Sequence, residues 1–226
     1  MEKSVKKFTG YTERTEQFLW GISLNNNREW FLEHKQEYTD SLYEPTKALT
    51  HEVWQRLEGS LSFDSSCRCS RIYRDARRLH GRGPYKDRMW FTISRSRQWV
   101  EEPVFYFEIR PDGAEYGLGC YDMKAATLER MRLIIDANPA RVESLLENTL
   151  ESGTFTLYGE DYKRPKGVFD SSLGMLYNKK KFGFTHVMKW GRELMSKKLP
   201  ERMAQDFKTL VPMMDFMLEF TSFEDE

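Results

Sequence analysis

The sequence predicts an α+β fold in which an antiparallel sheet from the middle of the chain is packed against N- and C-terminal helices. Apolar residues recur at helical spacing in the first and last thirds, whereas aromatic and β-branched residues fill the middle third. The turn Pro111-Asp112-Gly113 separates two of the middle segments, and so short a connection joins antiparallel strands. Helices, then strands, then helices are typical of this fold class.

Three helices are expected in the first third of the chain. Thr12 is a suitable N-cap for the first helix, which ends at the Asn25-Asn26-Asn27 turn. Asn26, followed by Glu29 three residues later, resembles a capping box for the second helix. Pro45 suits the first turn of the third helix.

Four strands are expected in the middle third, at SRIYRD (70–75), WFTIS (90–94), VFYFEI (104–109) and around AEYGLGCY (114–121). Their aromatic residues, Trp90 among them, are assigned to the core. In the first strand, alternation places Arg74 on the same side as Ile72, near a core. Arg74 then needs a pocket or a carboxylate partner, for which Asp75 and Glu108 are candidates.

Helices return near residue 124. Asn138 followed by Pro139 is a cap and first-turn pair that opens a second helix of this region. The stretch TLYGEDYKRPKG (156–167) is rich in turn residues, and a short helix follows it towards Lys179. The last helix begins near Pro200, and Pro212 should kink or break it.

Composition bounds the class of protein. The 226 residues contain no Pro/Gly/Ser-rich linker, so we expect one domain over residues 1–226. Basic and acidic residues number 35 each, so bulk charge does not drive the chain onto nucleic acid or membranes. No run of apolar residues is long enough for a membrane span, and the opening MEKSVKKF lacks the apolar part of a signal peptide. We therefore expect a cytoplasmic protein.

The cysteines and histidines do not form a metal-binding pattern. Three cysteines are an odd number without framework spacing, which fits a reducing compartment. Cys67 and Cys69 are separated by one residue, which is too close for a zinc knuckle, and the four histidines are scattered. We predict no metal site, and the sequence identifies no cofactor.

The segment RIYRDARRLHGRGPYK (71–86) gathers six cationic side chains around one acid, Asp75. Guanidinium groups form paired bonds with phosphate or carboxylate. Gly81 and Gly83 let backbone amides turn towards an anion, and Tyr73 and Tyr85 can stack on a ring or base. We therefore predict a site for an anionic ligand. The alternative is a solvated basic loop paired with acids elsewhere.

Four features follow one another along the chain: the opening FTGYTERTEQFLWGISLNNNREWF (8–31), the basic segment 71–86, the helix around Leu128 to Ile135, and the turn LYGEDYKRPKG (157–167). Their order resembles that of the uncharacterised family called domain of unknown function 2461, found in bacteria and fungi. The resemblance covers nearly the whole chain and implies no established activity. It implies that the following positions meet in space: Arg71, Arg74, Asp75, Arg77, Pro84, Tyr85, Lys86 and Arg132, with Lys163 and Arg164.

The chain departs from the family pattern inside the basic segment. A Phe and an Asp-Lys pair usually stand in the family where this chain has Arg78, Gly81 and Arg82. If that Asp is catalytic in the family, its loss here favours binding or a changed substrate over the same chemistry.

Three hypotheses for function remain open after the sequence. The first is binding of an anionic small molecule such as a phosphate ester or nucleotide, with catalysis left open; its proposed ligand-binding residues are Arg71, Arg74, Asp75, Arg77, Tyr85, Lys86 and Arg132. The second is a nucleic-acid-binding module in which the basic loop follows phosphates and the tyrosines stack, although zero net charge counts against it. The third is an internal ion-pair network or a face for a partner protein.

Overall fold

A computed structural model describes residues 7–75, 77, 79, 81–95 and 102–221. Over those residues the chain forms a six-stranded sheet of order β1-β2-β3-β4-β6-β5, and every neighbouring pair is antiparallel. The strands are β1 (Ser66–Cys69), β2 (Met89–Ser94), β3 (Val104–Arg110), β4 (Gly113–Gly119), β5 (Thr156–Asp161) and β6 (Lys179–Met188). The prediction of an α+β fold with an antiparallel sheet is confirmed.

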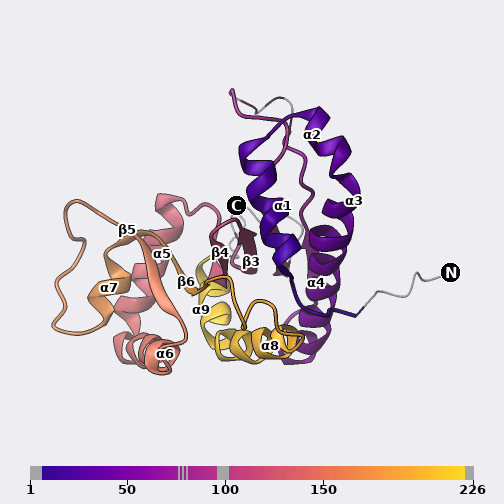
Figure 1. Ribbon diagram of the computed structural model, residues 1–226. Helices are drawn as coiled ribbons and strands as arrows, with labels where there is room; N and C mark the ends of the chain where they lie inside the picture. Colours follow the sequence, from indigo (N-terminus) through magenta and orange to yellow (C-terminus); the bar gives the residue numbers. More distant parts are fainter. Residues whose placement is uncertain (1–6, 76, 78, 80, 96–101, 222–226) are drawn as a thin grey trace.

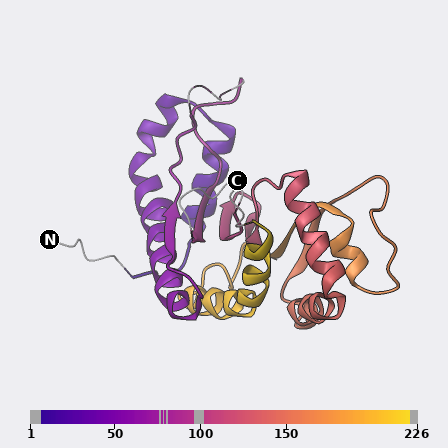
Figure 2. The same cartoon turned by 180° about the vertical axis from the view of Figure 1, so that it is seen from behind.

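Helices precede and follow the sheet, and three more lie between its strands β4 and β6 in the chain. They are α1 (Glu13–Leu24), α2 (Arg28–Glu33), α3 (Lys35–Glu37), the π-helix η1 (Tyr38–Tyr43), α4 (Glu44–Leu57), the 3-10 helix η2 (Glu58–Ser60), α5 (Ala125–Ala137), α6 (Pro139–Glu151), α7 (Leu173–Tyr177), α8 (Leu199–Thr209) and α9 (Val211–Thr221). Figure 1 shows α1–α4 standing together on one side of the molecule and α5–α7 on the other. Figure 2 shows the same division from behind. None of the described helices is long and apolar enough to cross a membrane.

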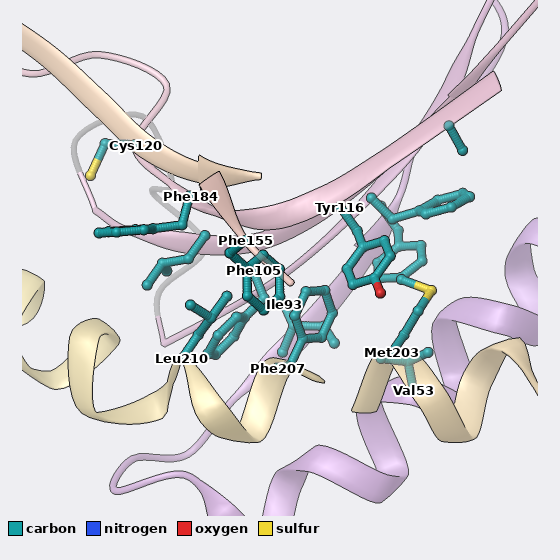
Figure 3. Close-up of a cluster of buried hydrophobic side chains, with 14 of the residues drawn as sticks. Val53, Ile93, Phe105, Tyr116, Cys120, Phe155, Phe184, Met203, Phe207 and Leu210 are labelled. Carbon is teal, nitrogen blue, oxygen red and sulfur yellow. The ribbon is translucent and has the colours of Figure 1, made fainter. Parts of the chain in front are cut away.

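The core lies on one face of the sheet, against the helices. In β3, Phe105 and Phe107 are fully buried, whereas Tyr106 between them is only half-buried. Phe207 of α8 packs with its ring centroid 5.0 Å from that of Phe105 and 5.6 Å from that of Tyr116. Figure 3 shows these side chains filling the space between the strands and the helices. The opposite face carries half-buried polar and aromatic side chains.

The local signals for turns and caps are confirmed at three places. Asn138 caps α6, because its side-chain oxygen accepts a hydrogen bond of 3.2 Å from the backbone N–H of Arg141. The turn before Gly113 joins β3 to β4. Pro212 lies in the first turn of α9, directly after the break at Leu210 that separates α9 from α8. A missing N–H is tolerated there and not further inside a helix.

Three strand predictions were wrong or absent. Residues 70–75 form no strand, and the edge strand β1 lies earlier, at Ser66–Cys69; Tyr73 makes only an isolated bridge to Tyr85. The stretch expected to be turns begins with strand β5, and β6 was not predicted. The edge strands β1 and β5 each pair with one distant neighbour, and the interior strand β6 begins with three lysines, so their own residues need not show a hydrophobic alternation.

The prediction that Asn26 caps the second helix was also wrong. Asn27 is the cap, since its side-chain oxygen accepts from the backbone N–H of Trp30 at 2.9 Å. Asn26 instead binds the backbone of Tyr85 on both sides: its Nδ2 donates to the Tyr85 carbonyl at 2.9 Å, and its Oδ1 accepts from the Tyr85 N–H at 3.0 Å. This pair ties the turn between α1 and α2 to the segment that leads into β2.

Packing and a second donor strengthen this tie. The buried Tyr85 ring stacks on Phe31 of α2, with ring centroids 4.1 Å apart. Arg74 donates from Nε to the same Tyr85 carbonyl at 2.7 Å. The backbone N–H of Arg74 also bonds the Pro84 carbonyl at 2.9 Å. The two ends of the basic segment are therefore fixed to each other and to the helices.

We predict that Gly83→Ala destabilises the protein. A Cβ at this position would collide with the Asn26 side-chain oxygen and with the Asn26 backbone carbonyl, and backbone cannot easily move aside. The expected loss is about 1–3 kcal/mol in the free energy of unfolding, measured by urea denaturation. Gly59→Ala is the matched control, because a Cβ at Gly59 meets nothing within 4 Å. Equal midpoints for the two variants would contradict the close packing described here.

Candidate functional site

The open face of the sheet is hollowed into a cavity of about 770 Å³. Strand register places its lining residues in rows across the sheet. One row runs from Trp90 through Glu108 to Glu115. The next row runs from Thr92 through Tyr106 and Gly117 to Thr185. Because side chains in one row are neighbours on the same face, these strands together form a continuous floor.

Glycines of β4 and β6 make room in this floor. A Cβ on Gly119 would lie 2.8 Å from the hydroxyl of Tyr158, and one on Gly183 would lie 2.6 Å from it. Tyr158 of the edge strand β5 therefore extends over both glycines towards the middle of the cavity. Gly117 has a different role, because a Cβ there would collide with the backbone carbonyl of Phe184.

The hydroxyl groups at this floor are neutral. Burial is the main cause that raises the pKa of Tyr106 and of Tyr158 above the ordinary value of 10.0. Thr185 lies close enough to Tyr106 to oppose that shift, yet its buried Oγ1 makes no hydrogen bond of standard geometry within the described residues. Neutral hydroxyls can donate and accept hydrogen bonds but are poor nucleophiles.

Lys86 brings a cation to one end of the cavity. Its Nζ donates to the backbone carbonyl of Arg71 at 2.7 Å and lies 5.8 Å from the centre of the Trp90 ring. Burial, followed by the nearby Arg74 and Arg68, lowers the pKa of Lys86 below 10.5. Arg74 and Arg68 therefore add unfavourable positive charge near an ammonium whose burial is already costly.

The two carboxylates in the cavity are already balanced by cations. Glu108 and Glu115 lie opposite each other on β3 and β4. Arg88 Nη1 lies 3.2 Å from Glu108, and Arg110 Nη2 lies 3.2 Å from Glu115. Burial raises the pKa of Glu108, and the facing Glu115 adds to this. Glu108 was a candidate partner for Arg74, but the carboxylate nearest the Arg74 guanidinium is Asp87, with an N–O distance of 3.8 Å.

The predicted anion-binding residues separate into three groups. Lys86 lines the cavity. Arg74 is committed to the Tyr85 carbonyl and to Asp87, and Tyr85 is buried against the helices. Arg71 and Arg77 are exposed, and Arg77 is held by Asp75 through bonds of 3.0 and 2.9 Å. Arg78 lies outside the described residues. Ligand binding by Arg71, Arg74, Asp75, Arg77 and Tyr85 stays a prediction.

Arg132 does not join them. It lies on α5, where Nε donates to the Tyr177 carbonyl at 3.0 Å and Nη2 to the Lys179 carbonyl at 3.3 Å. These carbonyls lie where β6 begins, far across the sheet from β1 and β2. Lys163 and Arg164 are exposed in the loop after β5, at the same distant edge. The three segments named by the resemblance therefore do not form one pocket in this structure.

Sequence analysis missed most of the cavity lining. Trp90 was assigned to the core, whereas Tyr106, Tyr158 and Lys181 were not considered. The alternation within VFYFEI does contain the signal, since it places Tyr106 and Glu108 opposite the phenylalanines. Tyr158 and Lys181 lie on β5 and β6, the strands that the sequence did not reveal.

The cavity also contains a thiol. Burial raises the pKa of Cys120 to about 12, so its thiolate is scarce at neutral pH. Across the part of the chain that the structure describes, no group of three or more His, Cys, Asp or Glu residues could hold a metal ion. The arrangement is suited to binding through hydrogen bonds, aromatic contact and the Lys86 charge.

We predict that Arg132→Met lowers stability, because it leaves the Tyr177 and Lys179 carbonyls without their donor. The expected cost is about 1–3 kcal/mol by chemical denaturation. Arg141→Met is the control, since Arg141 is exposed and pairs with the exposed Glu219, and such pairs contribute less than about 1 kcal/mol. A loss at Arg132 no larger than at Arg141 would argue against the internal role.

Comparison with known proteins identifies a family but no activity. No curated protein matches the chain. One family model, described as "Conserved hypothetical protein (DUF2461)", matches residues 14–216. The match covers nearly the full length and includes the turn at Asn26, the basic segment and every strand of the sheet. This chain belongs to the DUF2461 family of conserved hypothetical proteins.

Proposed function

We propose that this protein binds an anionic small molecule on the open face of its sheet, with the negative group of the ligand beside Lys86. The observation that carries the proposal is the position of Lys86 in a cavity, where burial and, after it, the nearby Arg74 and Arg68 disfavour its charge. An anion placed at this ammonium would relieve that repulsion. A charge-assisted hydrogen bond to Nζ would add to its affinity.

The size of the cavity supports a small molecule over a nucleic acid strand. Sites for small ligands usually measure about 300–1,000 Å³, and this cavity measures about 770 Å³. Binding of RNA or single-stranded DNA stays a prediction that rests on the basic segment alone. The proposal concerns binding and assigns no reaction.

The arginines have positioning roles in this proposal. Arg71 fixes Lys86 through its backbone carbonyl. Arg74 holds the Tyr85 carbonyl next to Lys86, and its charge contributes to the positive potential. The third hypothesis from the sequence was an internal ion-pair network. A network built on Arg74 and Asp87 is compatible with ligand binding, because it orients the cation that faces the cavity.

We predict that Lys86→Met abolishes anion-dependent stabilisation without lowering the melting temperature of the free protein. Loss of a hydrogen bond to a charged group costs about 1.5–3 kcal/mol, or roughly 10- to 150-fold in affinity. The measurement is a thermal-shift screen with inorganic phosphate, sugar phosphates and nucleoside monophosphates, followed by calorimetric titration.

Lys47→Met is the control for this variant. Lys47 also lies over an aromatic ring, at 5.3 Å from the centre of Tyr43, but it is outside the cavity and pairs with Glu44. The control should keep every ligand-induced shift. If the Lys86 and Lys47 variants respond to the anions as the wild type does, Lys86 is not the anion site.

A second prediction concerns pH. Because the pKa of Lys86 is lower in the folded protein than in the unfolded chain, the unfolded chain binds more protons between the two values. Stability from this group therefore increases as the pH rises through the lowered pKa towards 10.5. The free energy of unfolding of the wild type should thus rise relative to Lys86→Met between neutral pH and pH of about 10. A constant difference would show that the environment of Lys86 does not favour its neutral form.

A further inference from the structure

We infer that the anion held at Lys86 is the terminal phosphate monoester of a small molecule, and that Arg68 is its second cationic contact. This inference rests on the proposed function, since it assumes that the anion lies beside the Lys86 ammonium. It adds the charge of the anionic group and one binding residue that neither the sequence patterns nor the family resemblance named.

Arg68 reaches this end of the open face from the edge strand β1. Its neighbours in the strand, Cys67 and Cys69, pack against the core, so the alternation of side chains directs Arg68 to the opposite face. Strand register pairs Arg68 with Thr92, which lines the cavity together with Trp90. The Arg68 side chain is exposed, so it can turn towards an anion in the cavity without leaving a buried position.

Arg68 and Lys86 both lie against the ring of Trp90. The guanidinium carbon of Arg68 and Nζ of Lys86 are each 5.8 Å from the centre of that ring, so at most twice this distance separates them. Burial is the main cause of the lowered pKa of Lys86, and Arg74 and Arg68 add to it. The charge of Arg68 therefore acts at the Lys86 ammonium even before a ligand is bound.

The carboxylates near this pair of cations are engaged by other arginines. Each of the two, Asp87 and Glu108, has two arginine partners at N–O distances of 3.2–3.8 Å. Because those arginines balance the carboxylates, Asp87 and Glu108 add little net negative charge where Lys86 and Arg68 meet the cavity.

Two cations at one place favour a ligand group with two negative charges. A carboxylate or a phosphodiester carries one negative charge, whereas a phosphate monoester carries about −1.5 to −2 at pH 7 and has three strong acceptor oxygens. A monoester can therefore accept one charge-assisted hydrogen bond from Lys86 and another from Arg68 at the same time.

The test compares methyl phosphate, which is mainly a dianion at neutral pH, with dimethyl phosphate, which has the same core and a single charge. Both are titrated into the full chain, and binding is followed by NMR through the indole N–H signal of Trp90, assigned with Trp90→Phe. We expect methyl phosphate to bind the wild type at least about fivefold more tightly, as one extra charge close to a cation predicts. At a pH of about 5, where methyl phosphate is mainly a monoanion, this preference should fall to about twofold or less.

Variants at position 68 test the second contact. Arg68→Gln should reduce the preference for methyl phosphate to about twofold or less, whereas Arg68→Lys should retain it because the charge remains. Arg56→Gln is the control for the change in net charge, since Arg56 is exposed on α4, pairs with Glu52 and lies outside the cavity lining. The control should keep the wild-type preference.

The outcomes separate this inference from the proposed function. If both esters bind equally well and depend on Lys86, the monoester assignment is overturned while the proposed function stands. A preference that persists at a pH of about 5, or in Arg68→Gln, also overturns the inference. If neither ester shifts the Trp90 signal in a Lys86-dependent way, the inference is overturned; the proposed function is lost with it only if the wider anion screen also shows no dependence on Lys86. The comparison of the two pH values uses the wild type alone, so it holds even if a variant does not fold.

Discussion

The position of the cavity's cation depends on the backbone of one residue, Tyr85. Its carbonyl accepts from Asn26 at 2.9 Å and from Arg74 at 2.7 Å, and its N–H donates to Asn26 at 3.0 Å. Partly buried backbone groups have to be satisfied, and here the partners are Asn26, in a turn 59 residues earlier, and the Arg74 side chain, 11 residues earlier. The next residue, Lys86, bonds the Ile72 carbonyl at 2.7 Å through its own N–H. The backbone of Lys86 is therefore fixed independently of the contacts that its side chain makes.

This arrangement explains why Arg suits position 74. A guanidinium group can reach the Tyr85 carbonyl with Nε while Nη2 faces Asp87, which a single ammonium cannot do. The same group raises the potential at Lys86 and so opposes a second cation nearby. Two cations held close together cost free energy, and that cost persists in structures where function requires it. The basic segment is thus partly internal structure and partly the source of the field at the cavity.

The fold was predictable where local chemistry decides it and not where distant partners do. The caps at Thr12 and Asn138 and the alternation of β3 were visible in sequence. Strand β6 begins with Lys179-Lys180-Lys181, a charged run that does not resemble a strand; it pairs with β5, where Lys180 meets Glu160 at 2.6 Å. Arg132 entered the candidate site only through the family resemblance, and its carbonyl partners lie 45 and 47 residues away. Of the candidate site, only Lys86 was both predicted and found in the cavity lining, because the remainder depends on register across strands.

The two faces of the sheet differ in what they are built to contact. On the core face, phenylalanines fill the space against α8, and that face is closed by the protein itself. On the open face, Gly183 lies inside β6 and Gly119 ends β4, and glycine inside a strand weakens a sheet where a β-branched residue would pack better. Backbone contact accounts for Gly117, but only the position of Tyr158 accounts for the other two. Tyr158 pairs directly with Gly183 across the two strands, so its ring covers the glycines and recovers part of the packing that they lack. The part of the open face that a ligand can reach therefore lies beside this packed tyrosine, towards Trp90 and Lys86.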